Sequence, residues 1–85
     1  MFLAEPFVSS DHKIIESEIT GDLLVDFNSQ YNNINADNVI VSPRITVRFF
    51  GTIKKNLVIH EGARVYLHGT VLGKVENLGG EFYKY

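Results

Sequence analysis

The feature that most constrains the fold is an apolar pattern that returns every eighteen residues. Residues 38–55 read NVIVSPRITVRFFGTIKK and residues 56–73 read NLVIHEGARVYLHGTVLG, with a Gly-Thr pair at the same offset in both segments. The same shift matches Val47 with Val65 and Leu57 with Val75. Self-similarity at a fixed period is typical of repeat proteins, in which each unit buries its apolar face by stacking on the next unit.

A finer period lies inside each repeat, because aliphatic residues recur at every sixth position from Val41 to Val71. Three short strands per repeat predict a triangular β-helix, an all-β solenoid of about four coils. Alternation along each strand points residues such as Val39 and Val41 into the core and the residues between them outward. The repeat occupies residues 19–85, which we interpret as one solenoid domain.

Residues 1–18 do not share the repeat, although they include the apolar side chains of Phe2, Leu3, Phe7 and Val8. We expect this segment to cap the first coil, because the ends of a solenoid need to be covered. A detachable tail that binds a partner is the alternative interpretation.

The coils at the two ends depart from the regular period. Leu23 precedes Val39 by sixteen residues rather than eighteen, which indicates a looser first coil. In the last coil, KVENLGGEFYKY, a shift of eighteen places Tyr83 after Val65, whereas a deletion of one residue places Phe82 there instead. The sequence leaves these two registers open.

Composition narrows the classes of partner. The chain has 85 residues, a formal net charge of −2 and no cysteine. The charge argues against general attraction to nucleic acid or to anionic membranes, and the lack of cysteine excludes disulfides and thiolate chemistry. No run of apolar residues reaches the length of a membrane span, and the N-terminus lacks the pattern of a signal peptide. We therefore expect a cytoplasmic protein whose partner is another protein or itself.

Candidate chemistry centres on three histidines, because imidazole transfers protons and binds metals near neutral pH. His12 lies in the N-terminal segment, whereas His60 and His68 are expected to point outward from different strands of one coil. Neither of these two has a carboxylate arranged beside it in the repeat, and the glycine pairs lack the context of a phosphate-binding loop. The sequence predicts no catalytic residue, no cofactor and no metal, and thus no enzyme.

Outward positions form columns that are more informative. A shift of eighteen stacks Arg48, Tyr66 and Lys84 in one column, beside a second column of Thr46, Arg64 and Phe82. Tyrosine and arginine are frequent anchors of interfaces, so these columns form a candidate partner-binding face, unless they are a ladder that satisfies itself.

A third outward column is apolar, and it consists of Leu24, Ile40 and Val58. An exposed apolar patch needs a cover, which the N-terminal segment or a second subunit could supply. The last strand adds a further surface at an open coil end, where unpaired backbone groups invite strand pairing. The candidate residues for partner binding or self-association are Arg48, Tyr66, Arg64, Phe82, Tyr83, Tyr85, Leu24, Ile40 and Val58.

The runs ITGDLLVDF and INADNVIV, together with coils that end in Gly-Thr-aliphatic, resemble the bactofilins over about residues 19–78. This resemblance implies a triangular, right-handed β-helix and a bacterial protein that forms polymers. The chain departs from the pattern in having fewer coils and less glycine. A weaker similarity, carried by the period of six, is to the left-handed β-helix of hexapeptide acyltransferases.

Three functions follow from these observations. The first is a non-catalytic structural or scaffolding protein that self-associates through its solenoid end or its outer apolar face. The alternative is a small protein-binding module, such as an inhibitor or an immunity-type protein, that uses the exposed Arg/Tyr face. The third is a hexapeptide-type acyltransferase, for which the chain offers few coils to build a groove.

Overall fold

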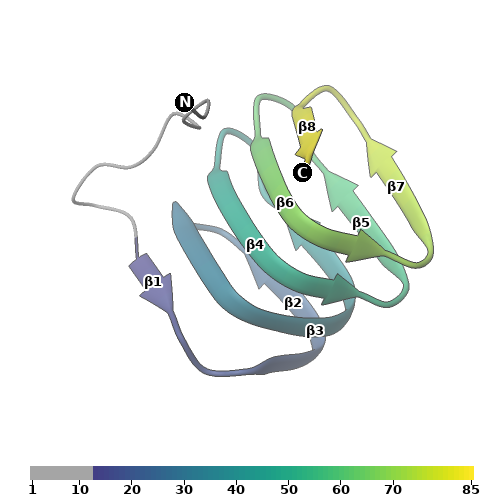
Figure 1. Cartoon of the computed structure of the whole chain (residues 1–85). Coiled ribbons are helices and arrows are strands. Elements are labelled where there is room, and N and C mark those ends of the chain that lie inside the picture. Colours follow the sequence, from purple (N-terminus) through teal and green to yellow (C-terminus); the bar gives the residue numbers. More distant parts are fainter. Residues whose placement is uncertain (1–12) are drawn as a thin grey trace.

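A computed structural model describes residues 13–85 of the chain, which form a stack of parallel coils without any helix (Figure 1). Short strands are separated by tight corners, as expected for a sequence rich in β-branched and aromatic residues with periodic glycines. The strands are β1 (Lys13–Ile15), β2 (Ile19–Val25), β3 (Ser29–Val41), β4 (Thr46–Ile53), β5 (Asn56–Ile59), β6 (Arg64–Val71), β7 (Lys74–Asn77) and β8 (Glu81–Lys84).

The strands pair in three parallel ladders, which are the three sides of the solenoid. Side 1 contains β1, the first parts of β3, β4 and β6, and β8. Side 2 contains the first part of β2, the middle of β3 and the last parts of β4 and β6. Side 3 contains the last parts of β2 and β3, followed by β5 and β7. The predicted β-solenoid of about four coils is confirmed.

The period is also confirmed where it was regular. Val47 pairs with Val65 and Leu57 pairs with Val75, each eighteen residues apart. In the first coil, Leu23 pairs with Val39, so the expected spacing of sixteen is correct. A coil of three strands turns its chain by a full circle, and each residue therefore lies above its counterpart in the previous coil.

The core fills the inside of the triangle. Inward residues from all three sides contribute to a fully buried core, in which the rings of Tyr31 and Phe49 lie 5.6 Å apart. The one buried polar side chain of the described residues, Ser29, donates a hydrogen bond of 2.9 Å to the carbonyl oxygen of Phe27. The residues with no exposed surface are Val25, Ser29, Ala36, Val39, Val41, Val47, Phe49, Ile53, Leu57, Ile59, Ala63, Val65 and Leu67.

The corner between sides 1 and 2 is built on glycine. Gly51 and Gly69 pair in register and have φ values of 134° and 156°. A Cβ atom on Gly69 would overlap the carbonyl oxygen of Gly51, and one on Gly51 would overlap the carbonyl oxygen of Ile34. The coils can approach at this corner only because both residues lack a side chain.

The structure of the last coil decides between the two registers that the sequence left open. β8 pairs Phe82 with Val65, Tyr83 with Tyr66 and Lys84 with Leu67, so the shift of eighteen is wrong here and the one-residue deletion is right.

The shortened corner before β8 explains this change of register. The side-chain oxygen of Asn77 accepts hydrogen bonds from the backbone nitrogens of Gly79, at 3.1 Å, and Gly80, at 2.7 Å. Residues 78–80 cross this corner where residues 60–63 cross it in the coil below, so the last coil uses one residue fewer. Glycine fits here because a Cβ atom on Gly80 would lie only 2.7 Å from the backbone oxygen of Ala63.

The expected capping segment lies mostly outside the described residues, which begin at Lys13. Its last part joins the solenoid, because β1 pairs in parallel with Ser29–Tyr31 of β3 as a strand of side 1. Ile15 at this end is half-buried against the core.

Candidate interaction surfaces

The apolar column on the outer face of side 3 is present as predicted. Leu24 pairs with Ile40, and Ile40 pairs with Val58, so the three side chains lie one above the other on successive coils. Leu24 is 58% exposed and Ile40 is 39% exposed, while Val58 is half-buried. The next position in this column, on β7, is Glu76. We name these three apolar residues the side 3 stripe.

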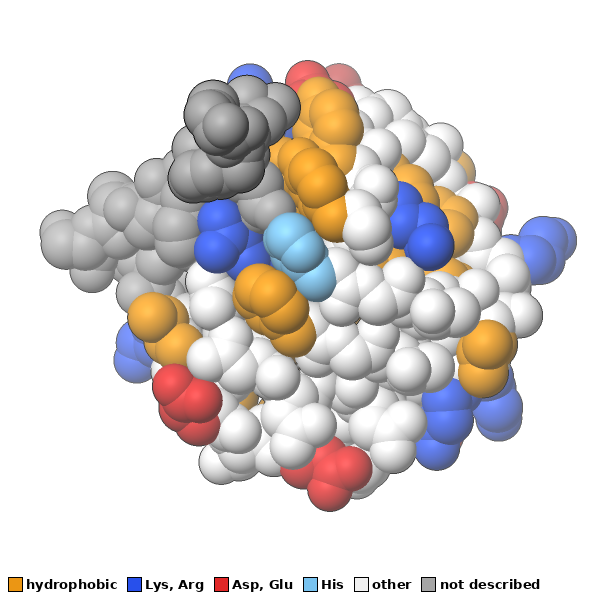
Figure 2. Space-filling view, in the orientation of Figure 1, with side chains coloured by type: hydrophobic (Ala, Val, Ile, Leu, Met, Phe, Trp, Pro, Cys, Tyr) orange, Lys and Arg blue, Asp and Glu red, His pale blue; other side chains and the backbone are white. Residues whose placement is uncertain are grey.

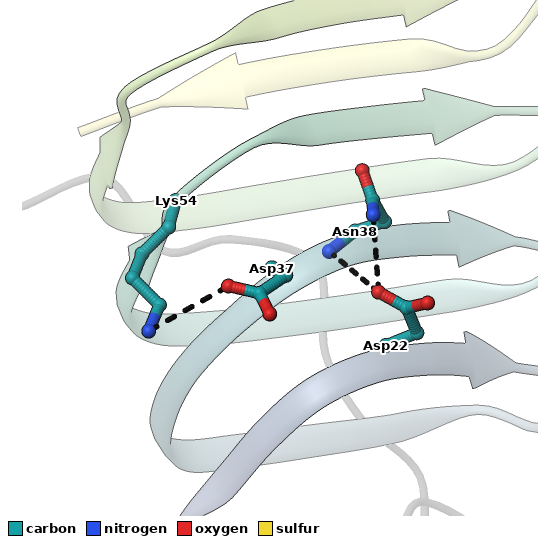
Figure 3. Close-up of polar contacts among 4 residues, drawn as sticks. All are labelled: Asp22, Asp37, Asn38 and Lys54. Atoms are coloured by element: carbon teal, nitrogen blue, oxygen red, sulfur yellow. Dashed lines mark hydrogen bonds and ion pairs between the residues drawn. The ribbon is translucent and has the colours of Figure 1, made fainter.

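A ladder of polar side chains borders the side 3 stripe at the corner with side 2 (Figure 3). Asp22 accepts hydrogen bonds through Oδ1 from the backbone nitrogen of Asn38, at 3.3 Å, and from its side-chain nitrogen, at 3.0 Å. Asn56 in turn donates to Asn38 at 3.2 Å, and Lys74 occupies the same position on the next coil. The neighbouring ion pair of Lys54 with Asp37 spans 3.6 Å (Figure 3). The stripe thus has a polar, internally bonded rim.

The outer face of side 1 differs from the predicted columns. The column that begins at Arg48 and Tyr66 continues to Tyr83, not to Lys84, because of the shorter last coil. The rings of Tyr66 and Tyr83 stack with their centroids 5.1 Å apart and their planes 12° apart. On the preceding coil, Arg48 donates a hydrogen bond of 3.3 Å to Gln30.

A second aromatic ladder runs beside the first one on side 1. The His68 ring lies between Phe50, 4.6 Å away, and Tyr85, 4.8 Å away, with planes that differ by 11° in each case. Over β4 and β6, Figure 2 shows a histidine with hydrophobic and cationic side chains gathered around it. Two parallel stacks therefore end on Tyr83 and Tyr85, which are 41% and 52% exposed.

Two of the predicted site residues, Tyr66 and Phe82, are less accessible than the sequence predicted. Tyr66 lies in an outward column but is only 3% exposed, so it supports Tyr83 rather than offering a face of its own. Phe82 does not follow Arg64 in the outer column, because it lies above Val65 and packs against the core. Glu81 takes that outer position and forms an ion pair with Arg64 at 3.6 Å. The predicted column of Thr46, Arg64 and Phe82 is wrong at its last member.

Glu81 also fixes the ring of Tyr83. The Tyr83 hydroxyl donates a hydrogen bond of 2.6 Å to the Glu81 carboxylate. This hydrogen bond raises the pKa of the Tyr83 phenol above its ordinary value of 10.0, since the bond is lost when the phenol ionises. Burial raises the pKa of Tyr31, whose ring lies in the core.

The described histidines lie on different sides of the solenoid. His60 follows β5 at the end of side 3, where its Nδ1 atom lies 3.2 Å from the carbonyl oxygen of Val41. His68 is stacked on side 1, and His12 lies outside the described residues. Among residues 13–85, no group of three or more histidine, aspartate or glutamate side chains is placed to hold a metal ion.

Comparisons with known proteins give no assignment. No family model matches the chain, no curated protein matches it, and no solved structure matches it. Within the described part of the chain there is also no helix that could cross a membrane. The candidate function therefore depends on the surfaces of this solenoid and on the sequence motifs.

The aromatic ladder of Phe50, His68 and Tyr85 was only partly visible in the sequence. The shift of eighteen pairs Phe50 with His68, but it gives His68 no partner in the last coil, since position 86 would be needed. The deletion before β8 brings Tyr85 to this position. The signal that could have found it is the Gly79-Gly80 pair, which marks a tight corner.

Proposed function

We propose that the protein is a non-catalytic structural protein that self-associates through the side 3 stripe. The observation that carries the proposal is a column of apolar side chains, with Leu24 and Ile40 exposed and a polar ladder along one border, an arrangement that favours association. The proposal includes a likeness to the bactofilins in the form of a right-handed solenoid, which here associates through its side rather than as an end-to-end polymer. Its support is the likeness of ITGDLLVDF, which lies in and after β2, and of INADNVIV, which lies in β3.

Association through the end of the last coil is less favourable than association through side 3. Lys84 and Asn77 occupy inward positions, above Leu67 and Ile59. A coil stacked on this end would enclose the Lys84 ammonium group and the Asn77 amide in an apolar interior. Burying an unpaired charge costs several kcal/mol, roughly 5 or more for an ammonium group. Inward charges are one way in which proteins protect sheet edges from pairing with further copies of the same chain.

Side 3 allows a twofold arrangement of two copies. Facing sheets pack about 10 Å apart. If the two solenoid axes run antiparallel, Ile40 of one copy lies opposite Val58 of the second copy, and Leu24 lies opposite Glu76, so the apolar contact is made by Ile40 and Val58. The same arrangement places Asp22 opposite Lys74 of the second copy, because these residues occupy the two ends of one column. The charges at the rim then complement each other, which favours the antiparallel orientation.

The stripe is small, so the association is expected to be weak. A stable interface buries about 800 Å² on each partner, which is more than three aliphatic side chains provide. We therefore expect dimers that form as the concentration rises, rather than an obligate dimer.

The experiment is light scattering coupled to size-exclusion chromatography over a hundredfold range of concentration. The wild-type mass should rise towards that of a dimer, and Ile40→Lys should stay monomeric. The matched control is Thr70→Lys, which adds the same charge at an exposed outward position of side 2 and should behave as wild type. A wild-type monomer at every concentration, or equal association of Ile40→Lys, would contradict the proposal. A mass that grows without limit would favour end-to-end polymers over side 3 dimers.

A second candidate is the protein-binding module, with side 1 as the binding face. The observation in its favour is the pair of exposed tyrosines, Tyr83 and Tyr85, on the same side of the solenoid as the cationic Arg48 and Arg64. Tyr66→Ala is a poor test, because that ring is buried. Arg48→Glu combined with Tyr85→Ala should abolish recovery of a partner while the circular dichroism spectrum stays unchanged. Full recovery by this double variant would remove side 1 from consideration.

A further inference from the structure

β8 is an edge strand whose outer edge is paired with no other strand of residues 13–85. The sheet order ends at β8, which pairs with β6 alone. Its backbone donors and acceptors on the far edge can therefore accept another extended strand. In a parallel sheet, such a strand would place each of its residues directly above a residue of β8 at a spacing of about 4.8 Å.

The outward positions of this edge are suited to bind aromatic side chains. Every ring of the two side 1 ladders that has a coil above it is stacked on the ring above, with centroids 4.6 to 5.1 Å apart. Tyr83 and Tyr85 end these ladders, and both remain substantially exposed. The Tyr83 ring is held in place by its hydrogen bond to Glu81. An added strand with aromatic side chains two residues apart would continue both ladders.

The position between the two tyrosines, Lys84, is suited to bind an acidic side chain. Lys84 lies above the buried Leu67, yet it is exposed at the open end of the coil. A residue of an added strand that lies above Lys84 would have its side chain beside the ammonium group. A carboxylate there forms an ion pair, whereas a lysine is repelled.

We propose that β8 is a docking edge for an extended peptide segment with the pattern aromatic–acidic–aromatic, bound in parallel by strand addition. The main chain supplies the hydrogen bonds, the two tyrosines stack on the rings, and Lys84 selects the acid. The β8 strand of a second copy does not fit in the same register, because Tyr83, Lys84 and Tyr85 would place lysine above lysine. This site is separate from the side 3 stripe and does not depend on self-association.

The test uses the full chain and short capped peptides, with backbone amide shifts in nuclear magnetic resonance as the readout. Thr-Tyr-Glu-Tyr-Thr should shift the amide signals of residues 81–85 and bind about three- to fivefold more tightly than Thr-Tyr-Lys-Tyr-Thr. Thr-Ser-Glu-Ser-Thr, which lacks rings, should bind about three- to tenfold more weakly for each ring that is lost. Equal binding of the ringless peptide, or shifts that map to another strand, would overturn the proposal.

Charge reversal gives the sharpest test. Lys84→Glu should invert the preference, so that the lysine peptide binds more tightly than the glutamate peptide. Lys55→Glu is the matched control at an exposed corner on another part of the solenoid, and it should keep the wild-type order. An unchanged preference in Lys84→Glu, the same inversion in Lys55→Glu, or no binding of any peptide at millimolar concentration would each refute the docking edge.

Discussion

Replacing Gly69 by alanine tests the geometry that allows the coils to stack. Gly69 has a φ of 156°, and an added Cβ atom would overlap the Gly51 carbonyl oxygen and lie 2.9 Å from its carbon. The carbonyl belongs to the backbone of the coil below, so no side-chain rotation can relieve the overlap. The two coils must separate at this corner, or the corner must change its conformation.

The expected cost has two parts. A side chain in this region of backbone conformation costs about 1–2 kcal/mol. Separation of the coils weakens the ladder near Gly51, and two hydrogen bonds at about 1 kcal/mol each are a reasonable measure of that loss. The sum is about 3–4 kcal/mol, a large part of the roughly 4–13 kcal/mol expected for a domain of this size.

Gly21→Ala is the matched control, because Gly21 has a φ of 75° but no atom within 4 Å of the added Cβ. It should lose only the conformational part, about 1–2 kcal/mol. Urea unfolding followed by circular dichroism measures both free energies of unfolding, and equal slopes would show that they are comparable. If Gly69→Ala loses no more stability than Gly21→Ala, the close approach of the coils does not limit this corner and the reasoning fails.

Three further predictions concern other parts of the solenoid. Arg44 is a non-glycine residue with a φ of 63°. Arg44→Gly should therefore raise the free energy of unfolding by about 1 kcal/mol, and an unchanged or lower midpoint of urea unfolding would contradict this. Ile53→Ala removes a fully buried side chain and should cost about 2–5 kcal/mol by the same assay, so a loss below about 1 kcal/mol would show that the core is not tightly packed there. The raised pKa values of Tyr31 and Tyr83 mean that the folded state holds these protons more tightly, so the stability that they contribute is present below pH 10.0 and is lost as the pH rises through the folded values. Absorbance titration should show that Tyr31 and Tyr83 ionise above pH 10.0, and Tyr83→Phe should remove the contribution of Tyr83; ionisation of both at the ordinary value would refute the assignment.

The amino-acid sequence determined most of the solenoid. A β-strand alternates its side chains with a period of two, and this local rule, combined with repeats of six and eighteen, is enough to assign inward and outward positions. The fully buried Val39, Val41 and Leu57 follow from it, and so does the side 3 stripe. The spacing of sixteen in the first coil was also readable, because the aliphatic residues there keep their alternation.

The last coil could not be determined in this way. Its register depends on how many residues the chain needs to cross the corner at Gly79 and Gly80, and that number is set by contacts with the previous coil. A change of one residue exchanges inward and outward side chains. Phe82 thereby moves from a predicted surface column into contact with the core, and Tyr83 takes the place above Tyr66.

Burial and ring stacking were likewise decided by the tertiary structure. The sequence placed Tyr66 outward, but the neighbouring coil supplies Tyr83, and the ring of Tyr66 ends up almost fully buried. Local periodicity fixes the direction in which a side chain leaves the backbone. The exposure of that side chain and its contacts depend on residues about eighteen positions away, and so does the type of residue at the end of each column. Only the stacking of the coils brings those residues together.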